Sequence, residues 1–205
     1  AQPNLNVMVV AGDGDFLSIG GEHIAPQAAR NLNICAVIMD NGVYGLTKGQ
    51  SSPTTLQGTI TSSTPFGKLE TKTNPLELYL TLGVSFIASG FSGQPRPLSQ
   101  LIRQGMEHSG FSIVHVQSPC TTYNDTFIEL KGDLANGIQP SLWDIPEDHD
   151  PSDRSAAHEL LQQGGVPVGV LYNDTSRISL DEAVVGTWEK AKPKTVEQLL
   201  GAFEF

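Results

Sequence analysis

The sequence has few cysteines, few basic residues and no long apolar run. Only two of its 205 residues are cysteines, Cys35 and Cys120, which excludes a disulfide framework and favours a reducing, cytoplasmic compartment. Lysine and arginine number 12 against 22 acidic residues, for a net charge of −10, so the basic surface that nucleic-acid binding needs is absent. No apolar run approaches the roughly 20 residues that cross a bilayer. We therefore expect a soluble protein with no nucleic-acid or membrane partner.

Short apolar runs alternate with helical patterns along most of the chain. A strand, a helix and a strand within about 35 residues form a βαβ unit, which requires parallel strand pairing. This order predicts an α/β fold, a doubly wound, mainly parallel sheet with helices on both faces. The expected strands are 6–11, 34–39, 84–88, 111–116 and 166–171, and the expected helices are 18–31, 75–82, 97–108, 152–163 and one from Thr195.

The length fits a single domain over residues 1–205. We expect residues 1–120 to form its core and residues 121–205 a C-terminal extension. Residues 40–74 are mostly polar, rich in Gly, Thr, Ser and Pro, and without periodicity. A loop of this length inside a compact domain is usually functional, so we predict that it binds a cofactor. Pro26 is expected in the first turn of its helix, where its missing N–H costs least.

Two polar residues follow neighbouring strands of the expected sheet. Asp13 stands between Gly12 and Gly14, and Asn41 follows the next strand. A Gly-Asp-Gly triplet alone is weak, because turns are rich in both residue types. The carboxyl ends of parallel strands share one edge, however, where open α/β sheets bind their ligands. Because Mg²⁺ takes oxygen ligands and usually phosphate oxygens as well, and the helix after Gly14 begins here and suits an anion, the sequence predicts a magnesium–diphosphate site.

Longer strings around these residues resemble a known family. Gly-Asp-Gly followed at this distance by Asn is similar to the fingerprint of thiamine diphosphate enzymes. The longer strings resemble the β subunit of 2-oxoacid:ferredoxin oxidoreductases, of the type acting on 2-oxoglutarate and related acids, over about residues 5–175. This resemblance implies the thiamine diphosphate-binding fold. The strings are Gly12-Asp13-Gly14-Asp15, Ile19-Gly20-Gly21-Glu22-His23, residues 40–50 (DNGVYGLTKGQ), Ser52-Pro53-Thr54-Thr55, residues 118–125 (SPCTTYND) and residues 149–154 (HDPSDR).

The resemblance implies roles for individual residues. Asp13, Asn41 and the carbonyl of Val43 would bind Mg²⁺. Leu46 would lie under the thiamine near its reactive carbon, and Lys48 would pair with the substrate carboxylate, so these two are the expected catalytic residues. A packed Leu46 and a solvated Lys48 are the alternatives. The expected cofactor-binding residues are Gly12, Gly14, Asp15, Leu46 and Thr47, together with His23, which stands beside two glycines at a helix start and could approach the diphosphate.

Cys120 matches a cluster ligand of the family. The resemblance implies a [4Fe–4S] cluster held by cysteines near the N-terminus of the β subunit and by a fourth cysteine that follows a strand and a proline. Such a cluster takes four thiolates, and this chain has two cysteines. Cys35 lies in an apolar strand and is expected in the core. The chain resembles the β subunit without its N-terminal cysteine-containing segment, so we expect a cluster only where that segment is present.

The resemblance implies oxidative decarboxylation of a 2-oxoacid, 2-oxoglutarate or pyruvate, to an acyl-CoA, with the electrons passed to ferredoxin. The implied partners are the oxidoreductase α subunit, ferredoxin, coenzyme A and the 2-oxoacid, in a dimer of heterodimers, and the isolated chain is expected to be inactive. Two alternatives stay open. One is a non-catalytic module that binds the cofactor or another subunit, and the other is a thiamine-dependent synthase or decarboxylase of the acetohydroxyacid type.

Overall fold

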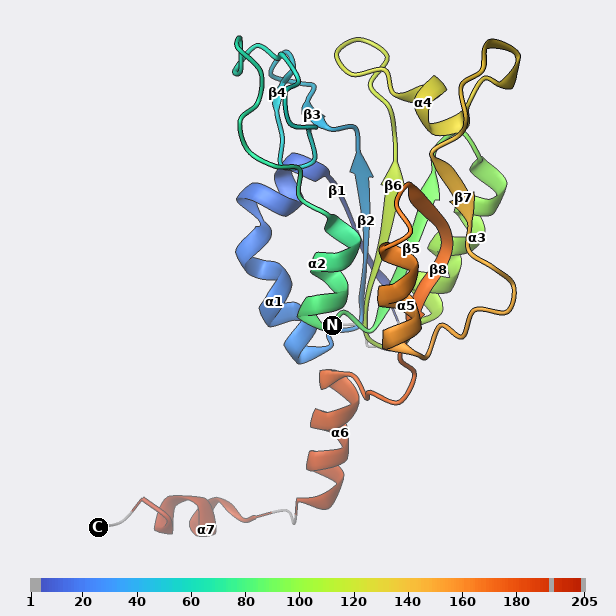
Figure 1. Cartoon of the computed structure of the whole chain (residues 1–205). Coiled ribbons are helices and arrows are strands. Elements are labelled where there is room, and N and C mark those ends of the chain that lie inside the picture. Colours follow the sequence, from blue (N-terminus) through green and yellow to red (C-terminus); the bar gives the residue numbers. More distant parts are fainter. Residues whose placement is uncertain (1–4, 192–193, 204–205) are drawn as a thin grey trace.

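The computed structural model describes residues 5–191 and 194–203, and its centre is a six-stranded sheet (Figure 1). The strand order is β1-β2-β6-β5-β8-β7. All neighbours pair in parallel except β5 and β8, which are antiparallel. The predicted mainly parallel α/β sheet is therefore confirmed. The strands are β1 (Val7–Gly12), β2 (Ile34–Asp40), β5 (Phe86–Phe91), β6 (Phe111–Gln117), β7 (Leu142–Asp144) and β8 (Val166–Asn173).

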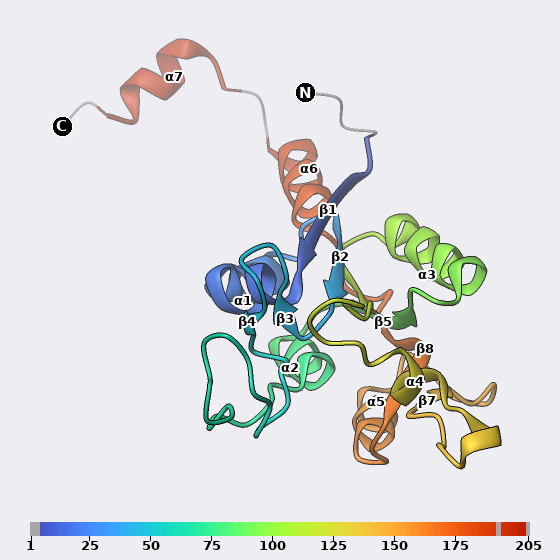
Figure 2. The same ribbon diagram turned by 90° about the horizontal axis from the view of Figure 1, so that it is seen from above.

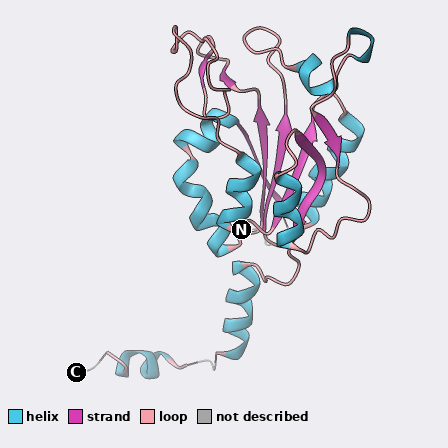
Figure 3. Ribbon diagram, in the orientation of Figure 1, coloured by secondary structure: helices cyan, strands magenta, loops and turns pink. Residues whose placement is uncertain are grey.

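Helices cover both faces of the sheet. Helices α1 (Gly21–Arg30), α2 (Pro75–Leu82) and α5 (Arg154–Leu161) lie on one face, and α3 (Pro95–Glu107) lies on the other (Figure 2). Helices α6 (Leu180–Lys190) and α7 (Val196–Gly201) run away from the sheet (Figure 3). None of the described helices is long and apolar enough to cross a membrane. The shorter elements are a π-helix η1 (Asp15–Ile19), strands β3 (Val43–Tyr44) and β4 (Gln50–Ser51), α4 (Phe127–Lys131) and a 3₁₀ turn η2 (Leu134–Asn136).

Local sequence explains where the helices beside the site begin and end. The Asn74 side chain accepts a hydrogen bond from the backbone N–H of Glu77, and Pro75 occupies the first turn of α2, where its missing N–H costs least. Gly83 ends α2 with a left-handed φ of 78°, a conformation that glycine adopts without strain. Asp153 caps α5 by accepting from two backbone N–H groups. The predicted start of α2 at Pro75 is confirmed, and α5 begins at Arg154, two residues after the predicted start of its helix.

Several local predictions were wrong. Pro26 lies inside α1 rather than in its first turn. Residues 121–150, for which no strand or helix was predicted, contain α4, η2 and β7, which are too short to show a periodic apolar pattern. Helix α6 was not expected, although Ser179 and Glu182 form a capping box at its start, and that box was a readable signal.

The apolar core forms two clusters, one on each face of the sheet. Buried residues of β2, β6 and α2 make the larger cluster, and α3 covers the smaller one. Cys35 is 2 % exposed within the smaller cluster, as predicted for a core cysteine. Asp40 and Asn41 therefore end and follow a mostly buried strand, β2, whereas β1, which precedes Asp13, is largely exposed.

Replacing Ile113 by alanine will lower the free energy of unfolding by roughly 2–5 kcal/mol, because it leaves a cavity in the larger cluster. Ile113 is fully buried, whereas Ile60 is 72 % exposed. The matched variant Ile60→Ala should change stability by less than about 0.5 kcal/mol. Urea unfolding of both variants measures the difference, and equal losses would contradict this account of the core.

Candidate functional site

Two buried carboxylates at the carboxyl edge of the sheet share one hydroxyl donor. Asp13 follows β1 and Asp40 ends β2, and they are 1 % and 5 % exposed. The Thr54 Oγ1 lies 2.7 Å from Asp13 Oδ2 and 2.7 Å from Asp40 Oδ1. A hydroxyl carries one proton, so Thr54 can donate to only one of the two at a time.

The charge of Asp13 is poorly compensated. Burial raises the pKa of Asp13 above its ordinary value, and the nearby charge of Asp40 adds to the increase. Hydrogen bonds, including that of Thr54, only partly offset this. A buried carboxylate without a cationic partner is costly, and a bound metal ion would supply the missing positive charge. This local imbalance fits a site for a divalent cation.

Asp40 has a protein partner on its inner side. Its Oδ2 lies 2.9 Å from His115 Nε2, and His115 Nδ1 lies 3.2 Å from the Tyr79 hydroxyl. Burial alone would raise the pKa of Asp40, but the hydrogen bond and charge of His115, with help from Thr54, outweigh it and hold that pKa below its ordinary value. The buried hydrogen bonds from Tyr79 to His115 and from His115 to Asp40 therefore favour the ionised form of Asp40, which shares the Thr54 hydroxyl with Asp13.

The loop after β2 brings Asn41 to Asp13. The Asn41 backbone N–H donates to Asp13 Oδ1 at 3.3 Å, and Asn41 Oδ1 accepts from the Val43 N–H at 3.0 Å. From the far side, Asn124 Nδ2 donates to the Asn41 carbonyl at 2.8 Å. Gly42 has a φ of +68°, and a Cβ there would lie 2.7 Å from Asn124 Nδ2. Glycine adopts this φ without strain, and the turn places the backbone of Asn41 against the Asp13 carboxylate.

Gly14 lies directly under the ring of Tyr44. The Tyr44 hydroxyl donates to the Gly14 carbonyl at 3.0 Å. A Cβ at Gly14 would lie 2.3 Å from Tyr44 Cε1. The second glycine of the Gly-Asp-Gly triplet is thus required by this close approach. It also ties the turn after β1 to the loop that carries Leu46 and Lys48.

That loop is open and partly strained. Leu46 is 99 % exposed, so it is not packed in this chain. Thr47 donates from Oγ1 to Gln50 Oε1 at 2.5 Å. Lys48 is exposed and has a φ of +76°, a left-handed conformation that is uncommon for a residue other than glycine. Strain of this kind clusters at binding loops, so the segment 45–49 is a strong candidate for ligand contact.

The remaining predicted cofactor residues lie in two places. Gly12 ends β1, and exposed Asp15 begins η1 beside it. The His23 side chain, 71 % exposed, lies in α1 and lines a groove with Val9 and Phe16. Neither Asp13 nor Asn41 lines that groove. The structure thus brings Gly12 and Asp15 to the metal candidates and leaves His23 apart from them.

Cys120 lies close to the loop that carries Asn41, a predicted metal ligand. Its backbone exchanges two hydrogen bonds with Asn124, of 3.2 and 2.9 Å, and Asn124 holds the Asn41 carbonyl. Across residues 5–191 and 194–203, no group of three or more His, Cys, Asp or Glu side chains could hold a metal ion. A magnesium site built from Asp13, an amide and a backbone carbonyl needs no such group. A four-thiolate cluster at Cys120 needs cysteines beyond the two in this sequence.

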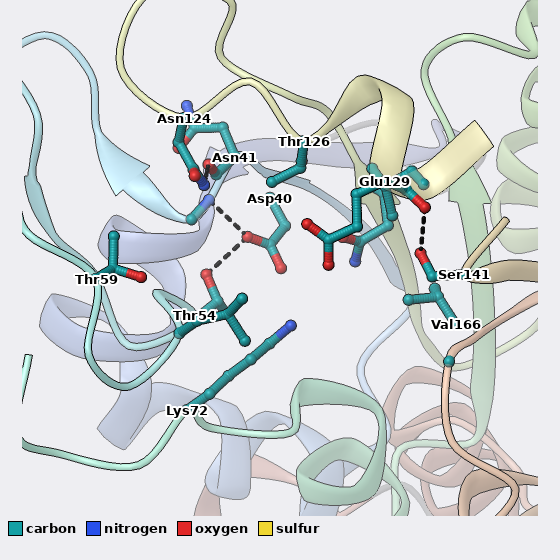
Figure 4. Close-up of a pocket in the computed structure, with 15 residues that line it drawn as sticks. Asp40, Asn41, Thr54, Thr59, Lys72, Asn124, Thr126, Glu129, Ser141 and Val166 are labelled. Carbon is teal, nitrogen blue, oxygen red and sulfur yellow. Dashed lines mark hydrogen bonds between the residues drawn. The ribbon is translucent and has the colours of Figure 1, made fainter. Parts of the chain in front are cut away.

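A cavity of about 210 Å³ opens beside this site, between the ends of β2 and β6 and the C-terminal extension (Figure 4). Asp40, Asn41 and Thr54 line one side, and Lys72 and Glu129 extend toward it from the others. The wall therefore carries both signs of charge. The cavity shares Asp40, Asn41 and Thr54 with the predicted metal site, so the two adjoin.

No role in the site was predicted for Asp40, Thr54, His115 or Asn124 from the sequence. Three of them lie inside the strings that carried the family resemblance, so position within a motif was the available signal. His115 lies in β6 and supports the site through its contact with Asp40. No sequence signal links His115 to the loop, because the contact depends on the pairing of β2 with β6.

Two family models match this chain, and both describe parts of enzymes. Residues 1–116 match the family model of the thiamine pyrophosphate enzyme, C-terminal TPP binding domain, thiamine pyrophosphate being another name for thiamine diphosphate. Residues 138–188 match the model of the C-terminal part of the pyruvate ferredoxin oxidoreductase beta subunit. A solved structure, 2-oxoglutarate:ferredoxin oxidoreductase from Magnetococcus marinus with 2-oxoglutarate, coenzyme A and succinyl-CoA bound, aligns with a TM-score of 0.88 and 38 % identity, over 100 % of this chain and 69 % of that one.

Curated relatives point to the same family. The 2-oxoacid:ferredoxin oxidoreductase 2, subunit beta, of Aeropyrum pernix is 35 % identical over 190 residues, 89 % of this chain and 61 % of the relative. The 2-oxoglutarate synthase subunit KorB of Archaeoglobus fulgidus is 40 % identical over 123 residues, 60 % of this chain and 46 % of the relative. The chain belongs to the β-subunit family of the 2-oxoacid:ferredoxin oxidoreductases, and the predicted resemblance is confirmed. It spans about three fifths of the length of the Aeropyrum relative.

Proposed function

We propose that the complete protein is a 2-oxoacid:ferredoxin oxidoreductase in which this chain binds Mg²⁺ and the diphosphate of thiamine diphosphate. The buried Asp13 carboxylate supports this proposal most directly. It shares its Thr54 donor with Asp40 and accepts a hydrogen bond from the Asn41 backbone N–H. A divalent cation would neutralise the excess charge there, and the cation would in turn attract a diphosphate.

The chain offers few ligands, as Mg²⁺ usually requires. Asp13, Asn41 and the Val43 carbonyl would supply three oxygens, with phosphate oxygens and water as the others. Gly12 and Gly14 would let the backbone approach the diphosphate closely. Asp15 and Thr47 would contact the cofactor from the two loops that Tyr44 and Gly14 tie together.

The exposed loop would serve the reaction itself. When bound, thiamine diphosphate supplies a nucleophilic carbon and an electron sink for the decarboxylation of a 2-oxoacid. Leu46 would contact the thiamine and keep water from it, and Lys48 would bind the substrate carboxylate by a charge-assisted hydrogen bond. The full exposure of Leu46 and the left-handed backbone of Lys48 support a loop that is held ready for such contacts.

The other parts of the enzyme would come from outside this chain. The proposed partners are the α subunit, ferredoxin and coenzyme A, in a cytoplasmic dimer of heterodimers. Cys120 would be one ligand of a [4Fe–4S] cluster completed by cysteines of an N-terminal segment. Within the chain, residues 1–205 would act as one domain, with 121–205 as an extension of the 1–120 core. We propose 2-oxoglutarate as the substrate, since the Magnetococcus structure contains it.

The complete protein, purified with its partner subunit and supplied with Mg²⁺ and thiamine diphosphate, will reduce methyl viologen when 2-oxoglutarate and coenzyme A are added. The absorbance of the reduced dye measures the rate. Pyruvate in a parallel assay decides between the two substrates. Leaving out coenzyme A should stop turnover, because the acyl group then has no acceptor.

Two results would overturn the proposal in different ways. Consumption of 2-oxoacid without any electron acceptor would indicate a synthase or decarboxylase of the acetohydroxyacid type. No dye reduction by an intact assembly that binds the cofactor would indicate a non-catalytic binding module.

A further inference from the structure

Lys68 is buried in the loop that carries Thr54. It is 6 % exposed, and its Nζ donates to the carbonyls of Ser52 at 2.9 Å, Thr55 at 3.0 Å and Pro53 at 3.2 Å. An ammonium group has three donors and no acceptor, so these three carbonyls satisfy it completely. Among the residues that the structure describes, Lys68 forms no ion pair. Within these described residues, the Lys68 ammonium therefore interacts only with backbone carbonyls of residues 52–55.

That segment is the one that reaches into the metal site. The three carbonyls flank Thr54, whose hydroxyl lies between Asp13 and Asp40. The next residue, Thr55, donates from Oγ1 to the Gly42 carbonyl. The segment 52–55 therefore contacts both loops that carry the predicted metal ligands, and Lys68 holds it from behind.

The position of Lys68 is itself fixed by the backbone. Lys68 accepts from the Gly58 N–H at 2.8 Å and donates its own N–H to the Thr59 carbonyl at 2.9 Å. Gly67 has a φ of +92°, and a Cβ there would lie 2.9 Å from the Gly58 carbonyl oxygen. This close approach lets the chain return so that Lys68 points under residues 52–55.

We propose that Lys68 is a positioning residue of the metal site, which acts through Thr54 to hold the Asp13 carboxylate in place for Mg²⁺. The inference rests on the proposed function. Without the ammonium, three carbonyls in a buried segment lose their donor, and the segment can relax away from the site. Thr54 then no longer fixes the orientation of Asp13. Groups that orient a metal ligand from behind typically contribute roughly 10- to 100-fold to metal affinity.

The test is the affinity for Mg²⁺ at saturating thiamine diphosphate, measured by titration calorimetry on the complete protein with its partner subunit. Lys68→Met should weaken Mg²⁺ binding roughly 10- to 100-fold. At saturating Mg²⁺ and thiamine diphosphate, kcat and the KM for the 2-oxoacid should return to wild-type values. Lys190→Met, which removes one charge from the remote helix α6, is the matched control and should bind Mg²⁺ normally.

A double-mutant cycle separates positioning from general support of the fold. If Lys68 acts through Thr54, the variant carrying both Lys68→Met and Thr54→Val will bind Mg²⁺ no more weakly than Thr54→Val alone. Additive losses would overturn the inference, as would wild-type Mg²⁺ affinity in Lys68→Met. If Lys68→Met does not fold, Lys68→Gln, which keeps part of the donor set, replaces it. A loss of Mg²⁺ affinity smaller than the roughly 10- to 100-fold loss expected for Lys68→Met supports the inference, and wild-type affinity overturns it. Failure of the wild-type protein to bind Mg²⁺ and thiamine diphosphate would instead reject the proposed function.

Discussion

Replacing Asp13 by alanine will abolish the Mg²⁺-dependent binding of thiamine diphosphate. Asp13 is the one proposed protein ligand that carries a charge, and it is nearly fully buried beside Asp40. Without its carboxylate, the protein offers a hard divalent ion only neutral oxygens, and the diphosphate alone supplies negative charge. Calorimetric titration of the complete protein with Mg²⁺ and thiamine diphosphate measures the loss.

Two further variants exclude a trivial cause for that loss. Asp13→Asn keeps the volume and one oxygen but loses the charge, so weakened rather than absent binding is expected. Because burial and the charge of Asp40 raise the pKa of Asp13, the ionised carboxylate is unfavourable in the cofactor-free protein. Asp13→Asn should therefore leave the cofactor-free protein as stable as the wild type or more so. Asp144→Asn, at the opposite edge of the sheet, should bind normally. Unchanged cofactor binding in Asp13→Ala would remove Asp13 from the metal site.

Replacing His115 by phenylalanine will destabilise the protein by roughly 3–5 kcal/mol at neutral pH, because it leaves Asp40 buried without its main partner. His115 is 1 % exposed and Asp40 5 %. Tyr79→Phe removes only the hydrogen bond between the Tyr79 hydroxyl and His115, and it leaves the contact between His115 and Asp40 intact. That control should lose about 1 kcal/mol. Chemical unfolding at fixed temperature gives both values.

The destabilisation should also depend on pH, and its sign follows from the pKa of Asp40. In the wild type this pKa lies below its ordinary value of 3.8. Ionised Asp40 therefore stabilises the folded protein above pH 3.8, and this stabilisation is lost as the pH falls through the folded-state pKa. In His115→Phe the effect of burial prevails and raises the pKa, so ionisation then costs stability. The gap between wild type and variant should therefore widen as the pH rises from below 3.8 toward neutrality. A gap that stays constant or narrows would show that His115 does not sustain the charge of Asp40.

The pairing of Asp13 with Asn41 was predictable because it depends on a local rule. Two consecutive parallel strands joined by a helix must end at the same edge of a sheet, and the apolar runs 6–11 and 34–39 were long enough to recognise. The family of the chain was likewise readable from short strings in the loops. Binding and catalytic residues lie disproportionately on loops, which makes such strings informative.

The contacts behind these ligands were not predictable. Thr54 reaches Asp13 across 41 positions of the chain, and His115 reaches Asp40 across 75. No periodicity encodes contacts of that separation. The irregular fold of residues 45–74 decides the first contact, and the pairing of β2 with β6 decides the second. The direction of β8 was hidden for a similar reason, since an apolar run identifies a strand but not its orientation.

Hydrophobic periodicity and glycine-rich turns, both local properties, therefore predicted the α/β sheet, the edge where Asp13 and Asn41 lie and the proposal that these two residues bind a metal ion. Tertiary structure alone decided how that pair is supported. The single hydroxyl shared by two carboxylates, the histidine behind Asp40 and the buried ammonium of Lys68 all depend on which distant segments come into contact. Burial gives these contacts their energetic weight, because a charge or carbonyl removed from water must find its partner within the folded chain.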